Sequence, residues 1–297
     1  MADGIKDDIG GALTRVSGVN GGGGGDPAGE DGVRRNESTN LWFFELSSLP
    51  TADGASAATL SRERSTFLAA AHRDGVRFTE RYSFQTLWNG VSVEINPADI
   101  GRLSRISGIK AVYPIGKITY DPGTQISPEM ESALAMTGAD IAQSELGLTG
   151  AGVKVGIIDS GVDVTHPCFA DTGFPATTQL GDKRFTNNKV IVAKVFNNKA
   201  GSKGYTAQAI GEHGTHVGGT VACDLTTAAK IGNVAIPYDP SGVAPGAQLG
   251  SYNVFPGDDG DARSEDILNA MEAAVVDGMD VLNMSLGGGS HLSLIHI

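Results

Sequence analysis

VKVGIID (residues 153–159) is the segment that most clearly indicates the fold of the chain. It is a near-continuous apolar run that ends in an aspartate, and such runs are typical of strands buried on both faces of a parallel sheet. Three more runs of this kind follow, VIVAKVF (190–196), LGSYNVF (249–255) and MDVLNMSL (279–286). Between the last two, residues 264–278 have helical spacing, with Ser264 as the expected cap. From about residue 130 the sequence therefore predicts an α/β fold with a doubly wound parallel sheet.

Residues 39–120 follow a different pattern. We expect, in order, a strand at 41–46, a helix at 60–75, strands at 78–84 and 90–95, a short helix at 97–106 and a strand at 109–115. The two middle strands are expected to join through a turn at Asn89–Gly90. The order β-α-β-β-α-β predicts a small ferredoxin-like α+β unit.

The remaining composition limits the classes of partner. Residues 1–38 are rich in Gly, Asp, Ser and Asn and are expected to form a disordered leader. Acidic residues outnumber basic ones by 34 to 22, for a net charge of −12, which argues against nucleic acid and anionic membranes as partners. No apolar run has the length of a membrane span, and the start MADGIKDD is unlike a signal peptide.

Asp159 is the first candidate catalytic residue. It follows directly on the strand 153–158, at the sheet edge where α/β enzymes place functional groups. A solvated aspartate that begins a turn with Ser160 and Gly161 is the simpler interpretation. Asp159 alone does not decide between the two.

The segment GEHGTHVGGTVACD (211–224) supplies a second candidate. It is interpreted as a buried helix that accepts three glycines, each costing up to about 1 kcal/mol against alanine, which indicates a need for close packing. His213 at its start can reach an aspartate at a neighbouring strand end. A metal site made of His213, His216 and Asp159 is an alternative, although no HExxH spacing or further His or Cys cluster supports it.

Three motifs, IIDSGVDVTHP, HGTHVGGTVA and VLNMSLGG, occur in that order and resemble the leading motifs of subtilisin-like serine proteases. The chain order Asp, His, Ser is known for subtilisin. The resemblance covers about residues 40–289 and implies a serine endopeptidase acting on polypeptides with an Asp-His-Ser triad. It implies that Asp159 and His213 are the triad aspartate and histidine, and that His216 is a structural histidine.

The resemblance also implies the substrate strand and the role of the N-terminal part. Ser285, Leu286 and Gly287 match the strand whose backbone pairs with an extended peptide. Residues 39–120, with the phrase RYSFQTLWNGVSVEINPADI, resemble an inhibitory prosegment that acts as an intramolecular inhibitor. Residues 121–297 then form the N-terminal part of the peptidase domain. No cofactor is expected for catalysis, and an extracellular location is implied.

Neither the Gly-Thr-Ser motif of the nucleophile nor the oxyanion asparagine of the family occurs in the chain. We therefore expect the chain to be C-terminally truncated before the catalytic serine and inactive by itself. The tail HLSLIHI (291–297) departs from the family pattern and is interpreted as non-native. Two alternatives from another class remain, a stand-alone protease inhibitor and a pseudoprotease binding module.

Two cysteines, Cys168 and Cys223, allow at most one internal disulfide. By resemblance, Cys168 stands where many relatives carry an aspartate that binds a structural calcium ion, and Cys223 lies beside the loop that binds the same ion. The resemblance therefore implies a disulfide in place of that clamp, or else two buried thiols. A structural calcium ion remains possible, although Cys168 stands at the position of its usual aspartate ligand. No other metal is expected.

Overall fold

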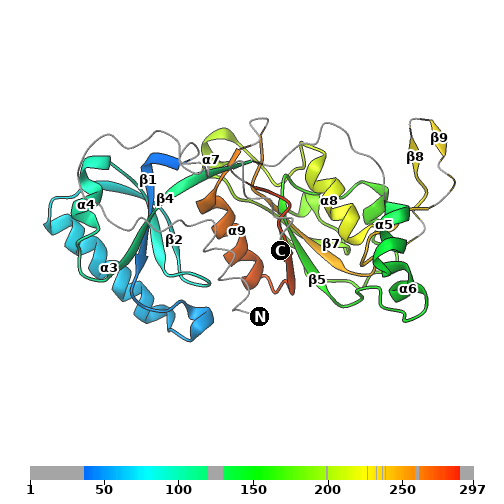
Figure 1. Cartoon of the computed structure of the whole chain (residues 1–297), viewed down its shortest axis with the longest axis horizontal. Helices are drawn as coiled ribbons and strands as arrows, with labels where there is room; N and C mark the ends of the chain where they lie inside the picture. Colours follow the sequence, from blue (N-terminus) through cyan, green and yellow to red (C-terminus); the bar gives the residue numbers. More distant parts are fainter. Residues whose placement is uncertain are drawn as a thin grey trace. The chain divides into compact units, whose positions relative to one another are not determined.

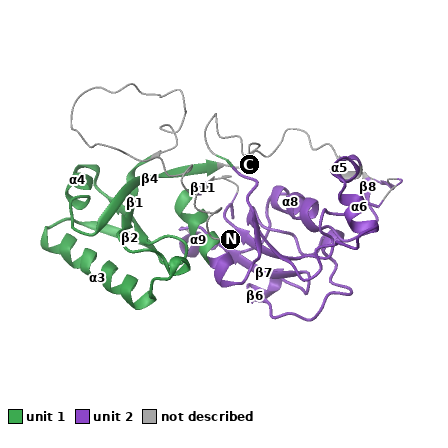
Figure 2. Ribbon diagram, turned by 60° about the horizontal axis from the view of Figure 1, so that its bottom comes forward, with its two compact units in different colours: residues 1–119, 263–272, 287–297 green, residues 120–262, 273–286 purple. Residues whose placement is uncertain are grey.

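The computed structural model describes residues 37–119, 130–198, 200–225, 227–231, 233–235, 237, 239–257 and 261–287. The leader 1–38, apart from its last two residues, and the tail 291–297 lie outside these ranges. The chain divides into two compact units, residues 1–119, 263–272 and 287–297 in the first and residues 120–262 and 273–286 in the second (Figure 2). Helix α9 (Ser264–Val276) is therefore shared between the two units, because its residues up to Glu272 belong to the first and those from Ala273 to the second.

The first unit follows the expected order β-α-β-β-α-β (Figure 1). Its elements are β1 (Glu37–Leu46), α3 (Ala57–Arg73), β2 (Phe78–Phe84), β3 (Gly90–Ile95), α4 (Ile100–Leu103) and β4 (Ile109–Thr119). The strands lie in the order β4-β1-β3-β2, and the pairings of β1 with β3 and β4 and of β2 with β3 are antiparallel.

Alternation along β1 gives this sheet two apolar faces. Phe44 and Leu46 point to a cluster that includes Phe67 of α3, whereas Leu41 and Phe43 point to a cluster that includes Leu268 of α9. Successive side chains on a strand face opposite sides, so one strand contributes to both cores. The sheet is thus covered by α3 on one face and by the first turns of α9 on the other.

The turn expected at Asn89–Gly90 is a longer connection, because β3 already begins at Gly90. A Cβ on Gly90 would lie 2.3 Å from the ring of Trp88 and 2.5 Å from the backbone oxygen of Phe44. The glycine is required by close packing between neighbouring strands and not by turn geometry. The connection between β2 and β3 consists of residues 85–89.

The second unit contains the predicted parallel sheet, which confirms this part of the fold. Its strands are β5 (Lys154–Asp159), β6 (Leu180–Gly181), β7 (Val190–Val195), β10 (Gln248–Asn253) and β12 (Val281–Asn283), in the order β12-β5-β10-β7-β6. All four pairings are parallel. β12 is shorter than the apolar run 279–286 suggested, and it pairs with β5 through Val281, Leu282 and Asn283.

Helix α8 (His213–Ala222) packs on this sheet with Gly214, Val217, Gly218 and Ala222 buried. The core between them includes Val155, Val162, Phe169 and Leu249. The remaining helices and strands are α5 (Met130–Thr137), α6 (Ala139–Ser144), α7 (Ala200–Lys203), β8 (Lys230–Ile231), β9 (Val234–Ala235) and β11 (Asp261–Arg263).

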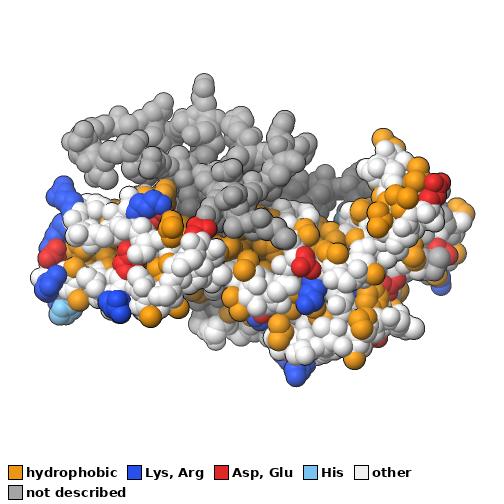
Figure 3. Space-filling model, turned by 90° about the horizontal axis from the view of Figure 1, so that it is seen from below, with side chains coloured by type: hydrophobic (Ala, Val, Ile, Leu, Met, Phe, Trp, Pro, Cys, Tyr) orange, Lys and Arg blue, Asp and Glu red, His pale blue; other side chains and the backbone are white. Residues whose placement is uncertain are grey.

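Two surface properties bear on partners. Among the described residues, no helix has both the length and the apolar character needed to cross a bilayer. On the face in Figure 3, Lys and Arg side chains lie in separate groups among acidic and apolar ones and do not merge into one basic surface. This distribution agrees with the net charge of −12.

Candidate active site

The sheet brings Asp159 to the carboxyl end of β5, as the sequence predicts. Its side chain is fully buried, and Oδ1 accepts a hydrogen bond from the backbone N–H of Ser160 at 2.7 Å. In the neighbouring strand β10, Asn253 is the partner of Asp159 in the register. The carboxylate is therefore held at a fixed place on the sheet edge and is not a solvated turn residue.

His213 begins α8 and faces this carboxylate. Its Nδ1 lies 2.8 Å from Oδ1 and 3.0 Å from Oδ2 of Asp159. An ionised carboxylate can only accept hydrogen bonds, so Nδ1 carries the proton and Nε2 is the nitrogen that can act as a base. About a fifth of the histidine side chain is exposed, 21%, whereas the aspartate has no exposure. One nitrogen is thus oriented by the protein, and the ring remains accessible.

Close packing of glycines makes this approach possible. A Cβ on Gly214 would lie 2.3 Å from the backbone oxygen of Gly161 and 3.1 Å from Oδ1 of Asp159. Gly161 itself has φ +94°, a left-handed conformation that suits glycine. The turn after β5 and the first turn of α8 can therefore pack backbone to backbone because Gly214 has no side chain, while Gly161 allows the left-handed conformation of the turn.

The expected substrate strand follows β12. Because β12 runs parallel to β5, Ser285 and Leu286 come just beyond its carboxyl end, at the same sheet edge as Asp159. Ser285 is exposed, and its hydroxyl accepts a hydrogen bond from Asn283 at 3.0 Å. Gly287 is the last described residue, and the substrate-binding role of Ser285, Leu286 and Gly287 stays a prediction.

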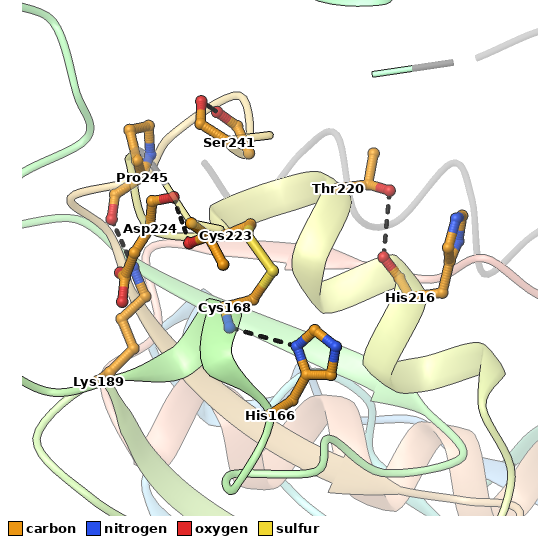
Figure 4. The surroundings of a disulfide bond; sticks show 11 residues. His166, Cys168, Lys189, His216, Thr220, Cys223, Asp224, Ser241 and Pro245 are labelled. Carbon is orange, nitrogen blue, oxygen red and sulfur yellow. Dashed lines mark hydrogen bonds and ion pairs between the residues drawn. A yellow bond between two sulfur atoms is a disulfide. The ribbon is translucent and has the colours of Figure 1, made fainter. Parts of the chain in front are cut away.

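The structure joins Cys168 and Cys223 in a disulfide with Cα atoms 4.3 Å apart (Figure 4). Cys168 lies in a 3-10 helix (Pro167–Phe169) nine residues after Asp159, and Cys223 is the C-cap residue of α8, ten residues after His213. The backbone N–H of Asp224 also donates to the oxygen of Cys168 at 3.0 Å. The disulfide therefore ties together the two chain segments that carry Asp159 and His213.

Beside the disulfide is a charged pair that the sequence did not reveal. The Lys189 ammonium contacts Asp224 at 2.9 Å, donates to the oxygen of Pro245 and lies 4.3 Å from the ring centroid of Phe174. Burial lowers the pKa of Lys189 and raises the pKa of Asp224, and their ion pair opposes both changes. Figure 4 shows the Lys189 side chain extending toward Asp224 and Pro245.

Two of the candidate metal ligands considered from the sequence, Cys168 and Asp159, make other contacts in the structure. In the described ranges, no three His, Cys, Asp or Glu side chains gather as metal ligands. Cys168 has its sulfur in the disulfide and offers no oxygen to a calcium ion. Asp159 contacts His213, and in Figure 4 His216 lies on α8 away from the disulfide.

The site thus contains an aspartate that orients a histidine at the carboxyl edge of a parallel sheet. Residues 150–294 match the sequence model of the Subtilase family. These residues form a subtilase domain.

Curated relatives support the same family. The chain is 32% identical over 228 residues to "Minor extracellular protease Vpr" of Bacillus subtilis (strain 168), which covers 69% of the chain and 23% of that protein. It is 32% identical over 238 residues to "Subtilisin-like protease SBT1.3" of Arabidopsis thaliana, which covers 70% of the chain and 28% of that protein. The chain thus spans about a quarter of the length of these relatives.

A solved structure shows the same fold. The structure of fervidolysin from Fervidobacterium pennivorans, "a keratinolytic enzyme related to subtilisin", superposes with a TM-score of 0.51. The match covers 86% of the chain and 37% of fervidolysin at 17% identity. At this identity the likeness concerns the fold alone.

Proposed function

We propose that this chain supplies the aspartate and the histidine of a serine endopeptidase that hydrolyses polypeptides. The contact of 2.8 Å between His213 Nδ1 and Asp159 Oδ1 carries the proposal. In the complete enzyme, His213 Nε2 takes the proton of the serine nucleophile as the serine attacks the peptide carbonyl. Asp159 keeps the ring in the required tautomer and stabilises the imidazolium. Ser285, Leu286 and Gly287 bind the substrate as an added strand.

Residues 39–120 are proposed to act as the inhibitory prosegment. Three acidic side chains of α9 hold them within the first unit. Glu265 accepts from Arg81 Nε at 2.8 Å, and Asp266 accepts from the Tyr82 hydroxyl at 2.9 Å.

The third acidic side chain makes the most extensive contact. Glu272 accepts from four consecutive backbone amides, those of residues 85–88, at 2.8–3.3 Å. Helix α9 lies within the residues that match the Subtilase family, and it binds residues 85–88 of the proposed prosegment. These contacts support a prosegment that is held until it is cut.

We also propose that the enzyme is secreted. The name of the Bacillus subtilis relative describes an extracellular protease. Disulfides such as Cys168–Cys223 persist mainly in oxidising compartments. Both observations favour an enzyme that acts outside the cell.

The test uses a peptide anilide and two forms of the protein. The 297-residue chain is expected to give no turnover, because the Gly-Thr-Ser motif that holds the nucleophile of the family does not occur in it. A chimera in which the segment after Gly287 is replaced by the corresponding region of the Bacillus subtilis relative is expected to hydrolyse the peptide. In this chimera Asp159→Asn should lower kcat by about 10⁴-fold and His213→Ala by about 10⁶-fold.

Asp163→Asn is the matched control, because Asp163 is an exposed aspartate of the same turn and its carboxylate accepts from Thr165. It is expected to keep activity within a few-fold of the parent chimera. Activity that survives His213→Ala, or turnover by the 297-residue chain that His213→Ala abolishes, would contradict the proposal.

A further inference from the structure

One residue is hydrogen-bonded both to Asp159 and to the residue that follows His213 on α8. The backbone N–H of Ser160 donates to Asp159 Oδ1 at 2.7 Å, and the Ser160 hydroxyl accepts from the backbone N–H of Gly214 at 2.9 Å. Gly214 directly follows His213 on α8. Ser160 is 1% exposed, so both hydrogen bonds are shielded from water.

Helix α8 needs a cap from elsewhere. The first N–H groups of a helix have no partner within the helix, and a side chain at the N-cap position usually satisfies one of them. In α8 the N-cap residue is Glu212, whose side chain makes no capping hydrogen bond. Ser160, 54 residues earlier in the chain, supplies this acceptor to Gly214.

The same turn is fastened at two more points. The N–H of Asp163 donates to Oγ1 of Thr215 on α8 at 3.0 Å, and the N–H of Val162 donates to Oγ of Ser251 on β10 at 3.0 Å. The turn therefore sits on the sheet through Ser251 and on the helix through Ser160 and Thr215. Of these contacts, only that of Ser160 also includes the carboxylate of Asp159.

We propose that Ser160 is a positioning residue that sets the approach of His213 to Asp159. Its amide fixes the carboxylate, and its hydroxyl caps α8 next to the histidine. Loss of the hydroxyl leaves the Gly214 N–H buried without an acceptor, so the first turn of α8 moves and the Nδ1 hydrogen bond lengthens. The importance of Ser160 for catalysis rests on the proposed function, but its effect on the distance between His213 and Asp159 does not.

The test is proton NMR on the full 297-residue chain. A hydrogen bond to a carboxylate shifts the Nδ1 proton of His213 downfield, and Asp159→Asn identifies this signal by removing it. In Ser160→Ala the signal is expected to move upfield or to disappear by exchange with water. In Ser160→Thr, which keeps a hydroxyl, the signal is expected to remain.

Ser251→Ala is the matched control. Ser251 is also 1% exposed, and its hydroxyl also accepts one backbone amide of the same turn, but it does not contact α8. Ser160→Ala and Ser251→Ala are expected to lower the melting temperature by similar amounts, with the His213 signal altered only in Ser160→Ala.

An unchanged signal in Ser160→Ala, or equal loss in Ser251→Ala, would overturn the inference. So would loss of the signal in Ser160→Thr as well as in Ser160→Ala, because the effect would then come from packing and not from the hydroxyl. None of these readouts needs peptide hydrolysis. A failure of the proposed protease activity would therefore leave the result interpretable.

Discussion

The ammonium of Lys189 lies 2.9 Å from Oδ1 of Asp224, and the lysine side chain has no exposure while the aspartate is 22% exposed. This difference in exposure decides which of the two side chains can be replaced at the smaller cost in stability. Removal of the aspartate leaves a buried charge whose remaining contacts, among the residues that the structure describes, are the Pro245 oxygen and the Phe174 ring. Removal of the lysine leaves a carboxylate that water can reach.

Asp224→Asn is therefore expected to lower the free energy of unfolding by about 3–5 kcal/mol, the usual cost of breaking a buried pair. Lys189→Met is expected to cost less, because the apolar side chain fills the same space. Urea unfolding measures both. Asp182→Asn removes the exposed pair with Arg184 and should cost under about 1 kcal/mol. A larger loss in Lys189→Met than in Asp224→Asn would refute this account.

The disulfide is expected to stabilise the second unit. It closes a loop with a sequence separation of 55 residues, for which the chain-entropy model predicts about 4 kcal/mol. The double variant Cys168→Ala, Cys223→Ala should lose about 2–5 kcal/mol in urea unfolding. Reductant should destabilise the parent chain by a similar amount and leave the double variant unchanged. If reductant leaves the stability of the parent chain unaltered, the prediction is wrong.

Two glycines of α8 should respond to alanine with opposite signs. Gly214→Ala places a Cβ 2.3 Å from the backbone oxygen of Gly161, a contact that backbone cannot easily relieve. We expect a loss of about 1–3 kcal/mol from overpacking. At Gly219 the nearest atom to a Cβ is the Cys168 sulfur at 4.0 Å, so Gly219→Ala should gain up to about 1 kcal/mol of helix propensity. Thermal unfolding of the two variants decides the matter, and changes of equal sign would count against this packing.

Glu272 should make the stability of the first unit depend on pH. Burial raises the pKa of Glu272 above its ordinary value of 4.5, although the backbone amides of residues 85–88 oppose the rise. Above pH 4.5 the unfolded carboxyl therefore loses its proton while the folded one still holds it. The unfolded state then binds fewer protons, so the stability that Glu272 contributes decreases as pH rises through this window.

The measurement is the difference in unfolding free energy between the parent chain and Glu272→Gln, determined from below pH 4.5 to neutral pH. This difference cancels the titration of the other carboxyl groups. It is expected to shrink with rising pH and to level off once the folded carboxyl has ionised. A difference that grows with rising pH would show that the amides, and not burial, dominate the pKa.

Much of the fold could be predicted because buried strands have a simple pattern. The runs around Val155, Val192 and Leu249 are apolar on both faces, which also fixed the place of Asp159 at a strand end. His213 was found because the glycines of its helix indicated close packing. These signals are local in the sequence, and local patterns are what single-sequence reasoning can use.

The remaining contacts depend on partners far apart in the chain. Ser160 was interpreted only as a turn residue, because its role requires α8 to arrive 54 residues later. Glu272 is one of several acidic residues on an amphipathic helix, and no spacing distinguishes it from a solvated one. Gly90 was assigned to a turn, whereas Trp88 and Phe44 require it to lack a side chain. Such residues are identified only when the tertiary neighbours are known.

The hydrogen bonds that Glu272 accepts from residues 85–88 have an evolutionary consequence. All four bonds go to main-chain amides, and the oxygens of Gln85 and Thr86 accept bonds from the main-chain amides of Thr51 and Ala52. The identity of the side chains at 85–87 does not enter these bonds, so mutations there can accumulate without loosening them. Proline is the exception, because it has no N–H to offer. Over generations the loop can drift in sequence, while the helix must keep a carboxylate at position 272.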